Sequence, residues 1–382
     1  MPVSLTVTNA VAVIGGKRQK CNIRIVDGLI QGILPASDVY GKSLDVRGRL
    51  VVPGLIDLHT HGGGGVDFSS AEPGELRTAR DFFAAHGVTG FLPTLAPDSE
   101  ETLLRGAMAI ARARSDFGCP QIWGIHLEGP FLNPDFAGCL PKSGLTAPNY
   151  ALFRRVQNAS GGLVRRVTLA PELPGAPELI RRLSDEGVGV SIGHTGADAE
   201  TVRKAIDAGA VCATHLFNAM PPPDHRRPGP AGAALAEDIF CEMICDGRHL
   251  APEIVRLIFK AKGAQRAVAV TDSIMAAGLS EGLYKTGFGN TVVKGADAKL
   301  LEDGTRAGSL LTMENALKNL MAFTGQPLEA CLPCVTEAPA RLLGVFSRRG
   351  SIDVGKYADL VVLSDDLQVL ATLSEGILIY QA

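Results

Sequence analysis

Residues 54–65 read GLIDLHTHGGGG, an apolar run that reaches two histidines, separated by one residue, and then four glycines. Successive side chains of a β-strand point to opposite faces, so His59 and His61 point to the same face, which in a barrel can be the interior. The glycines at 62–65 let the backbone approach a ligand closely. The pattern indicates a metal site. Two buried, hydrogen-bonded core histidines are the alternative, because unpaired buried polar groups are costly.

Further along the chain, other metal-ligand side chains recur at the ends of short apolar runs. They are Glu128 in IWGIHLEGP, His194 in GVGVSIGHTG, His215 in AVCATHLFNAM and Asp272 in RAVAVTDS. These side chains meet in space if the runs are parallel strands of a barrel, whose carboxyl ends face one site. The set predicts a metal-dependent hydrolase. Taken singly, each residue has a structural explanation: a salt bridge inside the barrel for Glu128, a satisfied core residue for each histidine and a helix N-cap for Asp272.

Strand-like and helix-like segments alternate through the middle of the chain, which predicts an α/β fold of the (β/α)8 TIM-barrel type. We expect barrel strands near 55–60, 88–92, 122–128, 165–170, 188–193, 211–215, 240–245 and 267–272. Residues 1–52 and 350–382 are instead short β-rich runs separated by turns. We expect these two ends to form one small β-sandwich domain, and residues 53–349 to form the barrel.

Composition narrows the class of protein. The 382 residues carry a formal charge of -3 with no basic stripe, which argues against nucleic acid as a partner. The sequence shows neither the pattern of a signal peptide nor an uncharged apolar run long enough to cross a bilayer, so we expect a cytoplasmic protein without a membrane partner. Cys331 and Cys334 form a C-x-x-C pattern, but no second pair or histidine cluster lies nearby to complete a zinc site.

Eight motifs in this order resemble the N-acetylglucosamine-6-phosphate deacetylases of the amidohydrolase superfamily. They are VVPGLIDLHTHG, HLEGPFLN, TLAPE, GHT, THLFNAM, CDGRHL, TDS and GSLLTMENAL. The resemblance covers nearly the whole chain. It implies one metal ion held by Glu128, His194 and His215, with Asp272 as the catalytic acid/base. It also implies that His59 and His61 can hold a second ion, that zinc or iron is the metal, and that the enzyme is a homodimer.

The resemblance also implies substrate contacts. His249 would touch the sugar or the carbonyl group, Asn218 and Ala219 would offer amide or backbone contacts, and Arg226 would meet the phosphate, either within one subunit or across a dimer interface. Arg227 is adjacent to Arg226 and is the alternative for that role, since the guanidinium fork matches phosphate oxygens. Structural alternatives are a helix-start residue near Pro252 for His249 and solvated loop charges for the two arginines.

One segment departs from the family pattern. Relatives carry a K-K-G-A-H type segment after HLEGPFLN, whereas PDFAGCLPKSG places Leu140 at the position of that histidine and lacks the usual lysines. Lys142 offers one compensating charge in a loop that is otherwise more apolar than a phosphate site should be. The sequence therefore supports deacetylation more strongly than recognition of a 6-phosphate.

The expected reaction is hydrolysis of the N-acetyl amide of N-acetylglucosamine 6-phosphate to glucosamine 6-phosphate and acetate, by a metal-activated water with an aspartate acid/base. A different N-acyl amine or an unphosphorylated amino sugar is the alternative substrate. A cyclic amidase is a further alternative, but such enzymes commonly use a modified lysine on the fourth strand, and LVRRVTLAPE contains none. A barrel that binds without turnover predicts a broken ligand set, yet all six positions are filled.

Overall fold

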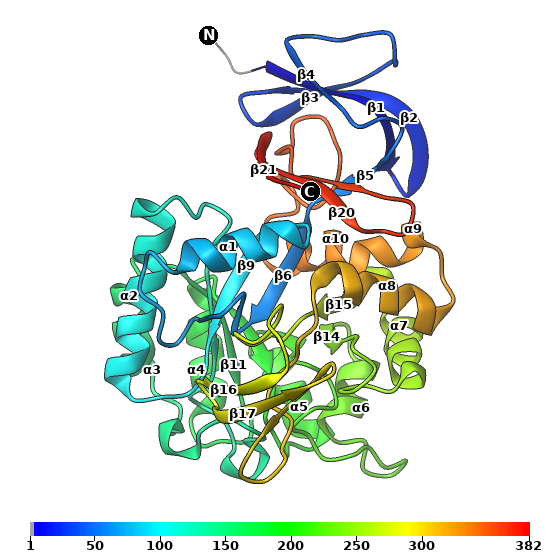
Figure 1. The fold of residues 1–382 in the computed structure, drawn as a ribbon. Helices are drawn as coiled ribbons and strands as arrows, with labels where there is room; N and C mark the ends of the chain where they lie inside the picture. Colours follow the sequence, from blue (N-terminus) through cyan, green and yellow to red (C-terminus); the bar gives the residue numbers. More distant parts are fainter. Residues whose placement is uncertain (1–3) are drawn as a thin grey trace.

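The computed structural model describes residues 4–382 and contains a barrel with a separate sheet at one end (Figure 1). Eight parallel strands form the barrel sheet, in the order β6, β9, β10, β11, β12, β13, β14, β15. The sheet closes at the carboxyl ends of its first and last strands, where the Asp272 amide donates to the His59 carbonyl and the His61 amide donates to the Ser273 carbonyl, each at 2.8 Å. The predicted (β/α)8 barrel is confirmed.

The barrel strands are apolar along most of their length because parallel strands in such a fold are covered on both faces. Their bounds are β6 Leu55–Thr60, β9 Val88–Leu95, β10 Ile125–Glu128, β11 Val164–Leu169, β12 Gly189–Ile192, β13 Ala210–Ala213, β14 Phe240–Ile244 and β15 Ala267–Val270. Each lies close to a predicted strand. The predicted ranges were too long in two places that matter, because β13 ends before His215 and β15 ends before Asp272.

The helices that follow the strands cover the outside of the barrel, each with one apolar face. In the fourth helix, for example, Leu179, Ile180 and Leu183 are buried while the intervening arginines are exposed. The helices are α1 Leu76–Ala85, α2 Glu100–Asp116, α3 Tyr150–Ala159, α4 Ala176–Asp185, α5 Ala199–Asp207, α6 Gly229–Ala236, α7 Pro252–Arg266, α8 Met313–Thr324, α9 Leu328–Cys331 and α10 Glu337–Leu342. Short 3-10 helices span Pro134–Phe136, Lys142–Gly144 and Leu332–Val335.

The two ends of the chain build the separate sheet, which is mixed and has eight strands. Its strands are β1 Ser4–Ile14, β2 Lys17–Val26, β3 Leu29–Leu34, β4 Lys42–Asp45, β5 Leu50–Pro53, β19 Leu360–Leu363, β20 Val369–Ser374 and β21 Ile377–Gln381. The antiparallel pairing of β5 with β19 joins the N-terminal and C-terminal parts, and Ile23, Val51 and Leu360 belong to their common apolar core. The expected small domain from both chain ends is confirmed as a sheet, while its boundaries at 52/53 and 349/350 stay a prediction.

An antiparallel insert between the last barrel strand and α8 was not predicted. It consists of β16 Gly282–Thr286, β17 Gly289–Lys294 and β18 Asp297–Leu300. Its return segment is tied to the barrel because the Ser309 amide donates to the Asp272 carbonyl at 2.8 Å. A shorter hairpin, β7 Gly62–Gly63 with β8 Val66–Asp67, follows the first barrel strand. In Figure 1 the insert lies away from the small sheet.

The sequence also led to expectations about membrane-spanning segments and about the pair Cys331 and Cys334. Within residues 4–382, the structure contains no helix that combines the length and the apolar character needed to span a membrane. Cys331 and Cys334 are buried free thiols at the end of α9 and in the 3-10 helix that follows it.

Candidate metal centre and active site

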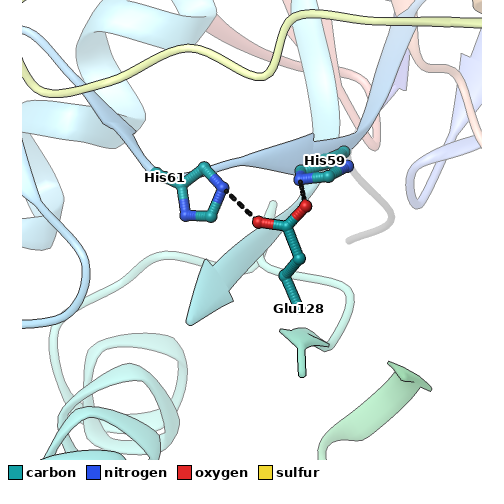
Figure 2. A group of neighbouring side chains, drawn as sticks. All are labelled: His59, His61 and Glu128. Carbon is teal, nitrogen blue, oxygen red and sulfur yellow. Dashed lines mark ion pairs between the residues drawn. The ribbon is translucent and has the colours of Figure 1, made fainter. Parts of the chain in front are cut away.

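His59 lies near the end of the first barrel strand and His61 directly follows that strand, and both rings are buried against Glu128, which ends β10. Figure 2 shows the Glu128 carboxylate between the two rings, with one oxygen directed at each. The Nε2 atom of His59 lies 3.4 Å from Oε1, and the Nε2 atom of His61 lies 3.1 Å from Oε2. The i, i+2 spacing therefore brings both histidines to one point inside the barrel.

His194 and His215 approach the same carboxylate at Oε1, the oxygen that also faces His59. Their Nε2 atoms lie 3.1 Å and 2.8 Å from Oε1 of Glu128, and 3.1 Å from each other. The Nδ1 atom of His194 lies 2.8 Å from the Phe136 carbonyl oxygen. Because a carbonyl oxygen only accepts, Nδ1 carries a proton in this contact, and Nε2 is the ring atom that faces Glu128 and His215.

The structure thus contains two groups of three possible ligands that share Glu128. One is His59, His61 and Glu128, and the other is Glu128, His194 and His215. The Nε2 atoms of His59 and His61 are buried and have no hydrogen-bond partner among the described residues. Orphaned ring nitrogens that converge on one buried carboxylate fit a divalent cation, because imidazole nitrogen and carboxylate oxygen are ordinary ligands for zinc and iron.

Electrostatics keep the shared carboxylate ionised. Burial raises the pKa of Glu128, but the charge of His59 and the hydrogen bonds from His194 and His215 outweigh burial and hold that pKa well below its usual range. Burial lowers the pKa of His61, but Asp272 and Glu128 raise it to about 9 overall. The site is therefore built around anionic oxygen atoms that need a positive charge nearby.

Asp272 lies beside both histidines of the first strand. Its Oδ1 atom is 3.3 Å from Nε2 of His61 and 3.5 Å from Nε2 of His59. Burial raises the pKa of Asp272, but the charge of His59 and the close contact with His61 lower it overall. No helix begins at this residue in the described chain, so the N-cap interpretation is wrong. The carboxylate lines the same cavity as Glu128.

Three of these side chains belong to residues with unusual backbone conformations. His194, His215 and Asp272 each lie two residues beyond the end of a strand, with φ angles of 49°, 25° and 49°. Positive φ is uncommon for residues other than glycine and tends to persist at functional sites. The turn into this conformation ends the strand and explains why the predicted strands 211–215 and 267–272 were too long.

A buried charged network supports His59 from behind. The Nδ1 atom of His59 lies 3.1 Å from Oε2 of Glu242, and Arg166 donates to Oε1 of Glu242 at 2.5 Å. Arg166 also donates to the Ser191 hydroxyl. This network was not predicted from the sequence, although a glutamate in FCEMI and an arginine in VRRVTL were signals, since charged residues inside apolar strands require partners.

His126 is a further buried histidine, and it was not predicted from the sequence to belong to the site. Its Nδ1 and Nε2 atoms lie 3.2 Å and 2.8 Å from the hydroxyls of Thr94 and Thr168. Burial, together with the charges of His59 and Arg166, holds the pKa of His126 well below its usual range. The ring packs edge-on against His59, with 4.6 Å between the ring centroids. His126 therefore contributes packing beside His59 rather than a charge.

The ligands open into a cavity of about 230 Å³. The predicted substrate residues Leu140, Asn218, Ala219 and His249 all line it. The Nδ1 atom of His249 lies 2.7 Å from Oδ2 of Asp246, which orients the ring. His249 precedes α7 and is not the N-cap of that helix, which is Ala251.

The two arginines predicted to meet a phosphate lie elsewhere. Arg226 and Arg227 are exposed in the loop before α6 and line a separate hollow with Asp198 and Pro221. They do not line the metal cavity within one chain. Arg248 and Arg306 line this cavity, and neither was predicted from the sequence to do so.

A barrel with shared histidine and carboxylate ligands at the carboxyl ends of its strands is typical of metal-dependent hydrolases. The profile of the Amidohydrolase family matches residues 50–378. N-acetylglucosamine-6-phosphate deacetylase of Bacillus subtilis (strain 168) is 40% identical over 343 residues, which are 88% of this chain and 86% of the relative. N-acetylgalactosamine-6-phosphate deacetylase of Shewanella sp. (strain ANA-3) is 36% identical and covers 96% of this chain and 94% of its own.

Solved structures show the same relationship. N-acetyl-D-glucosamine-6-phosphate deacetylase from Mycobacterium smegmatis, a mutant in complex with N-acetyl-D-glucosamine-6-phosphate, superimposes with a TM-score of 0.91 at 35% identity and full coverage of both chains. The chain therefore belongs to the amidohydrolase family, in the branch of the N-acetylglucosamine-6-phosphate deacetylases. It is a hydrolase that acts on a linear amide C–N bond.

Proposed function

We propose that the protein removes the acetyl group from N-acetylglucosamine 6-phosphate, giving glucosamine 6-phosphate and acetate. The observation that carries the proposal is the convergence of four histidines on the buried carboxylate of Glu128, with Asp272 beside them in one cavity. The names of the relatives support the substrate, as does the sugar phosphate bound in the Mycobacterium smegmatis structure.

Glu128, His194 and His215 would hold one divalent ion, and His59 and His61 would hold a second together with Glu128. Zinc or iron suits these ligands. Such an ion supplies a Lewis acid that polarises the amide carbonyl and makes water nucleophilic near neutral pH. The buried network of Glu242 and Arg166 orients His59, and the Phe136 carbonyl orients His194.

Asp272 performs the proton transfers in this proposal. Its ionised carboxylate accepts a proton from the attacking water and delivers it to the nitrogen of the leaving amine. Delivery is necessary because an amide anion is a very poor leaving group. The contact of Oδ1 with His61, at 3.3 Å, positions the carboxylate in the lining of the cavity, beside the candidate metal ligands.

His249, Asn218 and Ala219 bind and orient the sugar in the proposed complex. The Ala219 carbonyl already accepts a hydrogen bond from the Thr195 amide, so the N–H of Ala219 is the backbone group left to contact a ligand. The Asn218 side chain donates to the His215 carbonyl, which leaves its amide oxygen as an acceptor. Asn218 and Ala219 lie three and four residues after His215, so one segment carries a candidate metal ligand and the proposed sugar contacts.

The proposal also covers the oligomeric state of the enzyme and its cellular compartment. We expect a homodimer in which Arg226 or Arg227 reaches a second subunit, as the family resemblance implies. We place the enzyme in the cytoplasm, and the eight cysteines support this because all are free thiols. The cyclic-amidase alternative is disfavoured because β11 carries Arg166, which binds Glu242, and no lysine.

Acetate release from N-acetylglucosamine 6-phosphate, N-acetylgalactosamine 6-phosphate and unphosphorylated N-acetylglucosamine tests the proposal under identical conditions with metal-loaded enzyme. We expect the highest kcat/KM for N-acetylglucosamine 6-phosphate. A higher value for the galactosamine compound would assign the chain to the activity named for the Shewanella relative. Failure to release acetate from all three would refute the proposed reaction.

A further inference from the structure

Glu172 ends the motif TLAPE, yet it has no role in the proposed chemistry. It lies three residues after the end of β11 and does not line the metal cavity. It does not cap a helix either, because the N-cap of α4 is Gly175. Within residues 4–382, the Glu172 carboxylate forms no ion pair and instead accepts hydrogen bonds from three donors. All three donors belong to loops that follow neighbouring barrel strands.

Two of these hydrogen bonds act on the residues beside His194. The Thr195 hydroxyl donates to Oε2 of Glu172, and the Gly196 amide donates to Oε1 at 2.8 Å. Both donors directly follow His194, whose φ of 49° is uncommon for a residue other than glycine. Such a conformation persists only where the surrounding structure holds it. Glu172 therefore supports the turn from which His194 reaches the metal centre.

The third hydrogen bond leads to the ring of His194. The Asn133 side-chain amide donates to Oε1 of Glu172 at 2.8 Å, and the Asn133 backbone amide donates to the His194 carbonyl at 3.1 Å. Asn133 also caps the 3-10 helix 134–136, since its Oδ1 atom accepts a backbone amide of that helix. The helix ends at Phe136, whose carbonyl oxygen lies 2.8 Å from Nδ1 of His194. Glu172 is thus linked to the backbone of His194 and to the acceptor that orients its ring.

Close packing joins the two segments that Glu172 holds. A Cβ atom added to Gly196 would lie 2.4 Å from the Phe136 ring, so a glycine is needed where the loop after β12 passes the 3-10 helix. Thr195 is fully buried, and its hydroxyl oxygen accepts from the Ala197 amide at 3.0 Å. Without the Glu172 carboxylate, the proton of this hydroxyl would lose its acceptor, which is costly in a buried position.

We propose that Glu172 is a positioning residue for the metal ion held by Glu128, His194 and His215. It acts through His194 and touches neither the ion nor the substrate. The inference rests on the proposed metal site and deepens it, because it gives the motif TLAPE a role in that site. The other ligand group has a different support, since Glu242 holds His59. Loss of Glu172 should therefore weaken the binding of one ion and not of the other.

Zinc titration of the metal-free full chain against a competing chelator tests this role in the wild type and in His61→Asn. Glu172→Ala should weaken one zinc-binding step of the wild type roughly 10- to 100-fold, as expected when the outer support of a ligand is lost. His61→Asn keeps the affected ligand group, so zinc binding in that background should weaken by the same factor. Thermal melts of all variants show that they remain folded.

Glu172→Gln is the conservative variant. Its amide oxygen can still accept from Asn133 and Gly196, so it should bind zinc nearly as the wild type does. Asp359→Ala is the matched control, because Asp359 also accepts a loop amide, that of Glu375, but lies in the small sheet domain away from the metal centre. It should lower the melting temperature while zinc affinity stays at the wild-type value.

Asn133→Ala keeps the test decisive if Glu172→Ala does not fold. It removes the contact of Glu172 with the 3-10 helix, leaves the hydrogen bonds of Thr195 and Gly196 in place, and should weaken zinc binding roughly tenfold.

Unchanged zinc affinity in the folded variants would overturn the inference, and so would equal weakening of both zinc-binding steps in the wild-type background. Failure of the wild type to bind zinc would refute the proposed metal site and this role with it. Absence of acetate release from every sugar would refute the proposed reaction separately, because zinc binding requires no substrate.

Discussion

The imidazole of His59 lies between two carboxylates, with Nδ1 3.1 Å from Oε2 of Glu242 and Nε2 3.4 Å from Oε1 of Glu128. Glu242 has no exposed surface and is held by Arg166. A proton on Nδ1 donated to Glu242 leaves the Nε2 lone pair for a metal ion. Such an outer carboxylate fixes the tautomer and the orientation of a metal-binding histidine.

We therefore expect Glu242→Gln to weaken metal binding roughly 10- to 100-fold while the protein remains folded. Metal titration against a competing chelator measures the change, and a thermal melt checks folding. Glu314→Gln is the matched control because Glu314 is also buried and pairs with a histidine, His86, outside the metal centre. Unchanged metal affinity in Glu242→Gln would contradict the role of Glu242.

Glu128 belongs to both ligand groups, whereas His61 belongs to one. Glu128→Ala should therefore remove every bound ion, and His61→Asn should retain at least one, held by the group that contains His194 and His215. Elemental analysis of the purified variants after dialysis measures the metal content per chain. Complete metal loss in His61→Asn would show that the two groups do not bind independently.

Asp272→Asn should keep the metal and lose turnover, because asparagine preserves the shape of the side chain but cannot transfer the proton. We expect kcat to fall roughly 10²- to 10⁴-fold. The matched control is Asp198→Asn, since Asp198 caps α5 and asparagine caps a helix equally well. A variant Asp272→Asn with normal acetate release would exclude the acid/base role.

Leu140 packs rather than binds phosphate. It is 4% exposed and clusters with Ala96, Leu132 and Phe288 beside the cavity. Leu140→Ala should cost about 2 kcal/mol in the free energy of unfolding. The ratio of kcat/KM for phosphorylated over unphosphorylated substrate should not change.

Denaturant unfolding and acetate assays measure these two effects. Leu301→Ala, at a residue 56% exposed in the turn after β18, should change stability by less than about 0.5 kcal/mol. A large drop in phosphate preference in Leu140→Ala would show instead that the loop around Leu140 shapes the phosphate site.

The local pattern of apolar runs followed by polar residues was sufficient to predict the barrel. It also predicted which residues lie together at the carboxyl ends of the barrel strands. Parallel strands of a barrel are short apolar runs followed by turns, and His59, Glu128, His194 and Asp272 each mark the end of such a run. Strand ends were less predictable. β13 and β15 stop before His215 and Asp272 because these residues adopt positive φ, which their sequence does not reveal.

The sequence by itself determined the architecture and the chemical identity of the ligand set, because periodicity and the placement of polar residues after apolar runs are local properties. Only the tertiary structure decided which side chains touch. The sharing of Glu128, the support of His59 by Glu242 and Arg166, and the arrival of Arg306 from the insert join segments far apart in the chain. Those distances depend on how the barrel closes and how its loops fold back, which no local pattern encodes.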